Sequence, residues 1–170
     1  MSVITVNDNS LDVYDIKAHG SYPASFLSNF FPNSFRTRKG GVLCTSMEGF
    51  LQSLKFEDQE IQKNICNLSG FAAKYSGKSG NGWKKTQTLW WEGKKYDRVS
   101  VRYTKLIWSA YQDMFSQSRA FRKALRVTGN STLTHSIGRT DPKETVLTEQ
   151  EFVTILMKLR QMANEVEYRE

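Results

Sequence analysis

The chain has 170 residues, and its 24 lysines and arginines outnumber 17 aspartates and glutamates to give a formal net charge of +7. This length suits one domain with its own core and is too short for two ordinary domains. Because hydrophobic residues make up 39% of the chain, a mainly disordered protein is excluded. We therefore expect a single domain over residues 1–170, with a basic surface that favours phosphorylated or polyanionic partners.

Membrane, secreted and metal-binding classes find no support in the sequence. No apolar run approaches the ~20 residues of a membrane helix, and the first residues lack the basic start and apolar middle of a signal peptide. Cys44 and Cys66 are too few for a disulfide framework, and with His19 and His135 they form no metal-ligand spacing. We expect a cytoplasmic protein with two buried thiols, no membrane partner, no metal and no cofactor.

Short strands and a well-signalled helix are predicted in the first third of the chain. β-favouring residues on both sides of the turn-like segment 7–10 indicate a hairpin that includes Val13. Gly40 and Gly41 mark a turn, and 42–43 is expected to be a brief strand. Thr45 and Glu48 have the spacing of a capping box, which predicts a helix from residue 46 onward. Its apolar face would consist of Met47, Phe50, Leu51 and Leu54.

The rest of the chain predicts helices joined by short connections. A helical segment over 60–75 is broken near 69–70, and the glycine-rich stretch 76–82 is expected to be a flexible loop. Helical spacing continues over 99–115, and Ser118 is expected to cap a helix that ends near Gly129. Thr148 and Glu151 form a second capping box before the last helix. The prediction is a mainly helical α+β domain with a small β component.

The helix after Thr45 carries three polar side chains that could form a site. Glu48, Gln52 and Lys55 lie within about 60° of one another on a helix, at the edge of its apolar stripe. A carboxylate, an amide and an ammonium at a core boundary suit a site that binds and reacts with a polar ligand. Alternatively, Glu48 only caps the helix from the third position of the capping box, and Lys55 is only a solvated lysine.

Two aromatic clusters are candidate ligand contacts. Phe30 and Phe31 flank Asn29 in a run that follows neither a strand nor a helix period. They could be core anchors, or a shelf on which a base stacks while the Asn29 amide bonds a sugar hydroxyl. Trp90 and Trp91 stand among lysines, which is one pattern of single-stranded nucleic-acid binding. Core tryptophans with a solvated basic flank would give the same pattern.

Three segments resemble the motifs of the NADAR (YbiA-like) superfamily. They are F-L-S-N-F at 26–30, T-S-M-E at 45–48 and Q-S-L-K-F at 52–56, with further agreement at 73–77, 128–133 and 155–160. The resemblance implies a helix-rich α+β fold without a metal, with its core over about 22–164. It also implies cleavage of N-glycosidic bonds, in ribosylaminopyrimidine phosphate intermediates of riboflavin synthesis or in ADP-ribosylated guanine of nucleic acid.

The resemblance also implies roles for particular residues. The family's functional glutamate, amide and lysine fall on Glu48, Gln52 and Lys55, and its ligand-binding asparagine falls on Asn29. Two departures stand out. Gly49 occupies the position of a usual histidine, and 136–141 replaces a late W-G-x-G segment, where Asp141 is an offset candidate for the late acidic residue. Trp90 and Trp91 are candidates for the family's middle tryptophan.

The expected activity is that of an N-glycosidase. Glu48 would stabilise the positive charge of the sugar or act as base for water, and Lys55 would donate a proton, bind phosphate or form a transient imine. The net charge of +7 and the lysine-flanked tryptophans favour removal of ADP-ribose from guanine in nucleic acid. Two alternatives remain: the riboflavin intermediates as substrates, and a non-catalytic binder of ADP-ribose or nucleic acid, which the two departures motivate.

Overall fold

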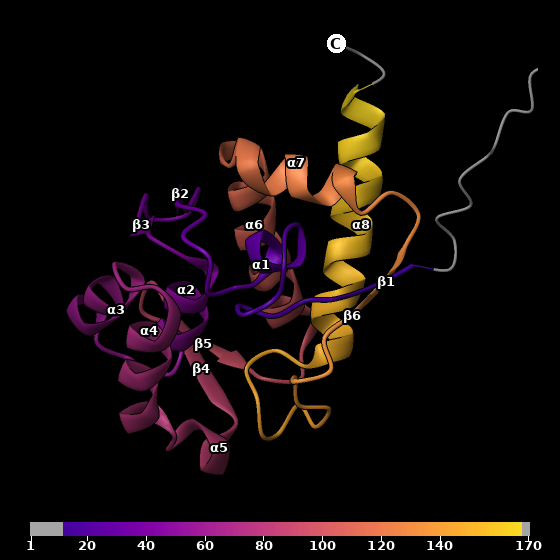
Figure 1. Cartoon of the computed structure of the whole chain (residues 1–170). Helices are drawn as coiled ribbons and strands as arrows, with labels where there is room; N and C mark the ends of the chain where they lie inside the picture. The colour runs from indigo at the N-terminus through magenta and orange to yellow at the C-terminus, as the bar shows by residue number, and fades with distance from the viewer. Residues whose placement is uncertain (1–11, 168–170) are drawn as a thin grey trace, which may run out of the picture.

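The computed structural model describes residues 12–167, which form a mainly helical α+β fold (Figure 1). The helices are α1 (Ala24–Leu27), α2 (Met47–Ser53), α3 (Gln59–Cys66), α4 (Gly70–Ser76), α5 (Trp83–Thr86), α6 (Val101–Gln117), α7 (Arg119–Val127) and α8 (Glu149–Glu167), with a 3-10 helix, η2, at Gly77–Gly80. The strands are β1 (Val13–Asp15), β2 (Phe35–Arg36), β3 (Leu43–Cys44), β4 (Thr88–Trp91), β5 (Lys94–Asp97) and β6 (Thr132–Thr134). The predicted fold class is confirmed.

The described strands form two-stranded pairs. β2 and β3 are antiparallel around the predicted turn at Gly40 and Gly41, whereas β1 runs parallel to β6 from the far half of the chain. The predicted strand at Val13 is therefore present with a distant partner, and the hairpin turn at 7–10 lies outside the described residues. The β1–β6 pair crosses α8 (Figure 1), and β6 packs against this helix, so the pair ties the start of the described chain to its C-terminal half.

The antiparallel pair β4–β5 was not predicted from the sequence. Its turn residues Glu92 and Gly93 have φ values of 52° and 73°, the left-handed conformations of a tight hairpin turn. Trp91 faces the core beside Phe50, with ring centroids 4.9 Å apart, and Trp90 faces the other side of the hairpin. The run of tryptophans and lysines is thus a strand pair with one buried face.

Helix caps account for two of the boundaries that the sequence predicted. The Thr148 hydroxyl accepts from the Glu151 N–H at 3.1 Å, and the Glu151 carboxylate accepts from the Thr148 N–H at 2.8 Å, as a capping box requires. Ser118 caps α7 as predicted, by accepting from the Phe121 N–H at 3.1 Å. Residues 77–80 form a 3-10 helix that continues α4, so the prediction of a flexible loop was wrong there.

The core lies where α6 and α8 pack with α7 and α2. Its largest fully buried side chains include Tyr103, Tyr111, Phe121 and Phe152. Cys44 and Cys66 are buried free thiols, as predicted. Within residues 12–167, no helix has both the length and the apolar character needed to cross a bilayer.

Gly49 allows α2 to pack directly against the end of α3. A Cβ at this position would lie 2.7 Å from the carbonyl oxygen of Leu68 and 2.9 Å from that of Ile65. Backbone atoms cannot move aside as the end of a flexible side chain can. The histidine that NADAR members usually carry here therefore has no room in this chain.

We predict that Gly49→His lowers the free energy of unfolding by about 3 kcal/mol, because overpacking against backbone forces α2 and α3 apart. Urea denaturation of the variant and the parent protein measures the difference. Gly82→His is the matched control, because Gly82 has φ of −56° and nothing lies near a Cβ built on it. Equal destabilisation by the two variants would contradict the close-packing explanation.

Candidate active site

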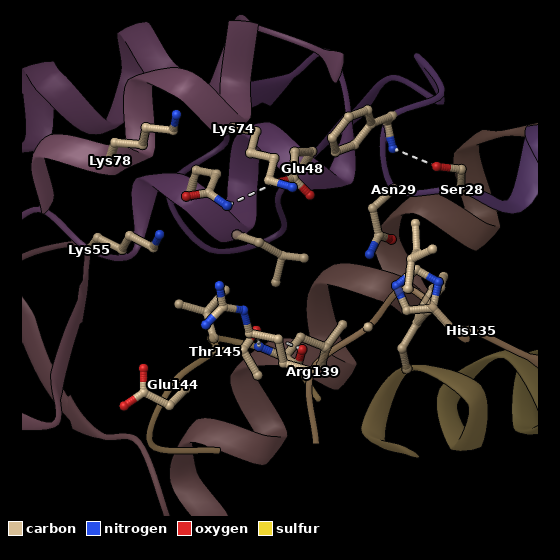
Figure 2. Close-up of a pocket in the computed structure, with 18 of the residues that line it drawn as sticks. Ser28, Asn29, Glu48, Lys55, Lys74, Lys78, His135, Arg139, Glu144 and Thr145 are labelled. Atoms are coloured by element: carbon tan, nitrogen blue, oxygen red, sulfur yellow. Dashed lines mark hydrogen bonds between the residues drawn. The ribbon is translucent and has the colours of Figure 1, made fainter. Parts of the chain in front are cut away.

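A cavity of about 350 Å³ lies between α2, α4 and η2 on one side and the irregular segment 135–147 on the other (Figure 2). This volume is within the ~300–1,000 Å³ range of small-molecule sites. Five of the residues predicted for the site line it together: Asn29, Phe30, Glu48, Gln52 and Lys55. The cavity thus collects side chains from segments that are far apart in the sequence.

Glu48 lies on the α2 side of the cavity and is only 8% exposed. The helix is capped by Ser46, whose hydroxyl accepts from the Gly49 N–H at 3.1 Å, so the alternative that Glu48 caps the helix is wrong. The carboxylate accepts a hydrogen bond from Gln52 Nε2 at 2.8 Å. Burial raises the pKa of Glu48 above its ordinary value, while the Gln52 hydrogen bond and the charges of Lys74 and Lys55 oppose the rise.

Gln52 uses one of its two polar atoms to orient the Glu48 carboxylate, and the other is available to a ligand. Its Nε2 is committed to Glu48, whereas its Oε1 is buried and has no partner within the described structure. Gly77 makes room for this amide, because a Cβ there would collide with Gln52 Oε1. An unpaired buried acceptor beside a cavity is a place for a ligand to donate a hydrogen bond.

Lys55 lies just beyond the C-terminal end of α2 and is half-buried. Burial lowers its pKa to about 8, against the opposing charge of Glu48 and with the help of Lys84, Lys74 and Arg139. An amine with such a pKa exists in both its protonated and neutral forms near physiological pH. Lys55 can therefore exchange a proton at pH values where an exposed lysine cannot.

Asn29 lies next to the start of α2 and is fixed there by two hydrogen bonds. Its carbonyl oxygen accepts from the Glu48 N–H at 2.9 Å, and its Oδ1 accepts from the buried Tyr111 hydroxyl at 2.7 Å. Because Oδ1 is occupied, the amide presents Nδ2 as a donor toward the cavity (Figure 2). Phe30 adds an aromatic surface next to this donor.

Four cationic side chains besides Lys55 surround the cavity. They are Lys74, Lys78, Lys84 and Arg139. Lys84 forms an ion pair of 3.1 Å with Glu144 on the facing wall. The buried indole N–H of Trp83, which also lines the cavity, has no hydrogen-bond partner in the described structure. This donor and the positive charges suit an anionic ligand such as a phosphate.

His135 enters the cavity from the end of β6. Its Nδ1 lies 2.7 Å from the Ile16 carbonyl oxygen, which can only accept, so Nδ1 carries the proton and Nε2 is an acceptor in the neutral ring. The ring packs against Phe152 with centroids 5.0 Å apart. Its position relative to Glu48 and Asn29 is visible in Figure 2.

The other predicted substrate contacts do not line the cavity. Phe31 stacks on Phe26 with ring centroids 4.1 Å apart, and Trp91 is buried in the core. Trp90 lies beneath Lys95 on the hairpin, and the exposed Asp141 accepts from the Lys143 N–H at 2.9 Å. The structure therefore offers these four residues no contact with a ligand in this cavity.

Sequence reasoning overlooked most of the charged rim. Lys74 and Lys78 could have been found, because an i, i+4 pair of lysines accompanies Phe71 and Tyr75 at helical spacing. Arg139, Glu144 and His135 had no such signal. They lie on a segment without periodicity, and only the tertiary structure brings this segment over α2.

Comparisons with known proteins agree on one family and one fold. Residues 21–161 match the model of the family described as bacteriophage protein GP30.3. An uncharacterised 17.1 kDa protein from the Gp30–rIII intergenic region of Enterobacteria phage T4 is 35% identical over 147 residues, which cover 86% of this chain and 95% of that protein. The NMR structure of the E. coli protein YbiA has the same fold, with a TM-score of 0.60, 14% identity and coverage of 95% of this chain and 89% of that one. The chain therefore belongs to the bacteriophage GP30.3 family.

Proposed function

We propose that this protein is an N-glycosidase that hydrolyses the bond between a ribose carbon and a base nitrogen, with ADP-ribosylated guanine in nucleic acid as its substrate. The observation that carries the proposal is that a buried glutamate and a lysine with a lowered pKa line one cation-rimmed cavity. The fold shared with YbiA and the NADAR-like motifs support the same class of enzyme.

The reaction needs stabilisation of opposite charges at its two ends. As the C–N bond breaks, positive charge develops on the anomeric carbon and negative charge on the departing nitrogen. Glu48 stabilises the positive charge and accepts a proton from the attacking water, for which its raised pKa is an advantage. Lys55 gives a proton to the departing nitrogen, so water is added across the bond without any net change of protons.

Other groups would hold the substrate. Asn29 Nδ2 donates to a ribose hydroxyl, since Tyr111 occupies its Oδ1, and Gln52 Oε1 accepts from another. Phe30 covers one face of the base. The cations of the rim and the indole N–H of Trp83 bind the phosphates of the ADP-ribose group.

A ribosylaminopyrimidine phosphate is the second candidate substrate. The observation in its favour is that a single cavity of about 350 Å³ holds the whole cation cluster, which also fits one compact phosphorylated sugar. The two candidates share the cleaved bond and differ in what lies beyond the cavity.

Removing the carboxylate tests the proposed chemistry. We expect Glu48→Gln to lower kcat by about 10²–10⁴-fold, because the amide can neither accept a proton from water nor offset the charge on the sugar. Release of ADP-ribose from a modified oligonucleotide, followed by chromatography, measures the change. Glu57→Gln, at an exposed position outside the cavity, should retain the parent rate. Full activity in a folded Glu48→Gln protein would remove the mechanism.

The pKa of Lys55 predicts an alkaline limb in the pH profile. If the protonated amine is the acid, the rate falls as pH rises through about 8, because the fraction of protonated Lys55 falls there. In Lys55→Arg the guanidinium stays protonated, so the residual activity should lose this limb. A rate that increases through the same range, together with an adduct trapped by borohydride, would assign an imine to Lys55 instead.

A side-by-side assay distinguishes the substrates. We expect faster turnover, measured as kcat/KM, for ADP-ribosylated guanine in an oligonucleotide than for a ribosylaminopyrimidine phosphate. The opposite order would assign the enzyme to the small molecule. If the protein binds both compounds and releases neither base nor sugar, it is a binder and not an enzyme.

A further inference from the structure

Two large aromatic side chains of α4 are exposed to solvent next to the cavity. Phe71 is 66% exposed and Tyr75 is 72% exposed. They are four residues apart, so they lie on the same face of the helix, about 6 Å apart along its axis. Neither is needed for the core, since the buried residue of α4 is Ala73. Aromatic side chains so exposed and so close together indicate a surface that binds something.

Lysines alternate with these aromatics, Lys74 on α4 and Lys78 on the 3-10 helix η2 that continues it. Lys74 and Lys78 follow Phe71 at three and seven residues, and Lys78 Nζ lies 5.3 Å from the Tyr75 ring centroid. Between Glu60 and Glu92 the sequence has five lysines and no acidic residue. We call the surface formed by Phe71, Lys74, Tyr75 and Lys78 the α4 face. It is cationic and aromatic, and the stretch of sequence that forms it contains no acidic residue.

The α4 face is continuous with the cavity. Phe71 packs edge-on against Phe30, which lines the cavity, with ring centroids 5.3 Å apart. Lys74 Nζ lies 6.0 Å from the Phe30 ring centroid, and both lysines of the face line the cavity. In Figure 2 the two lysines lie on the same side of the cavity as Glu48. A ligand on this face would lead directly to the candidate catalytic groups.

We propose that the α4 face binds single-stranded nucleic acid and holds the nucleotides next to the one in the cavity. Bases stack on Phe71 and Tyr75, and the phosphates between them meet Lys74 and Lys78, which is how aromatic and basic side chains combine in single-strand binding. The inference rests on the proposed function, because it names the form of nucleic acid from which the enzyme removes ADP-ribose.

The chemistry of the face favours a single strand over a duplex. Stacking on a side chain needs bases whose faces are free, whereas a duplex presents only base edges and the sugar-phosphate backbone. A helix turn that carries two aromatic rings offers stacking to neighbouring unpaired bases of any sequence. The strand is therefore recognised by its accessible bases and its charge, and not by its sequence.

The first test measures the binding of unmodified nucleic acid, which does not depend on catalysis. The probes are fluorescein-labelled, unmodified oligonucleotides of mixed sequence, as single-stranded DNA, single-stranded RNA and duplex DNA, measured by fluorescence anisotropy. For each stacking side chain removed, Phe71→Ala and Tyr75→Ala should raise the single-strand Kd about five- to one-hundred-fold. Tyr75→Trp, unlike Tyr75→Ala, should keep the single-strand Kd of the parent protein, because an indole ring also stacks on bases. The DNA and RNA probes together distinguish the two kinds of strand.

Val99→Ala combined with Val101→Ala is the matched control. These two apolar side chains are 69% and 72% exposed, as much as the aromatics, and they lie outside the cavity of the candidate site. This variant should bind like the parent protein. Unchanged single-strand binding by the Phe71→Ala, Tyr75→Ala double variant, or a preference of the parent protein for the duplex, would overturn the proposal.

Rates of ADP-ribose release test this inference separately from the proposed N-glycosidase function. The double variant should lose kcat/KM on ADP-ribosylated guanine in a single strand, and it should retain the parent rate on an ADP-ribosylated mononucleotide. If both rates fall together, the face acts through Phe30 and not through the strand, which contradicts the inference. If the parent protein releases ADP-ribose from neither substrate, the proposed function fails, and the anisotropy result still decides whether the face binds single strands.

Discussion

The cavity depends on the close approach of α2 to its neighbours, which keeps one carboxyl group away from water. Gly49 lets the helix touch the backbone at the end of α3, and Gly77 lets the Gln52 side chain lie flat against η2. Because both contacts exclude solvent, Glu48 is buried at the cavity wall and its pKa is raised. A looser packing of α2 would leave an ordinary surface glutamate at the same position.

The same packing concentrates positive charge around Glu48. Lys55 loses part of its proton affinity through burial, and three further cations add to this effect. Like charges held together and a partly buried amine cost stability unless other contacts offset them. The offset comes from elsewhere in the fold, where α6 and α8 bury large aromatic side chains. Stability and chemistry are therefore supplied by different parts of the chain.

Local signals in the sequence predicted the helices better than the site. The Thr148–Glu151 capping box and the Ser118 cap need only neighbouring residues, so both were predicted correctly. At α2 the same reasoning chose Thr45 and missed Ser46 as the cap, because two adjacent hydroxyl residues compete for one role. Glu48, Gln52 and Lys55 were found because they belong to one short segment. Arg139 and Glu144 reach the cavity only through tertiary structure, and Trp91 was misread because the pairing of β4 with β5 decides which tryptophan is buried.

The ion pair between Lys84 and Glu144 joins α5 to the facing wall of the cavity, and it changes what an anion gains by binding at Lys84. Lys84 already has a counter-ion, so a phosphate that approaches it has to displace the carboxylate of Glu144. Binding at that point is an exchange of an internal anion for an external one, and its net electrostatic gain is smaller than the local charge suggests.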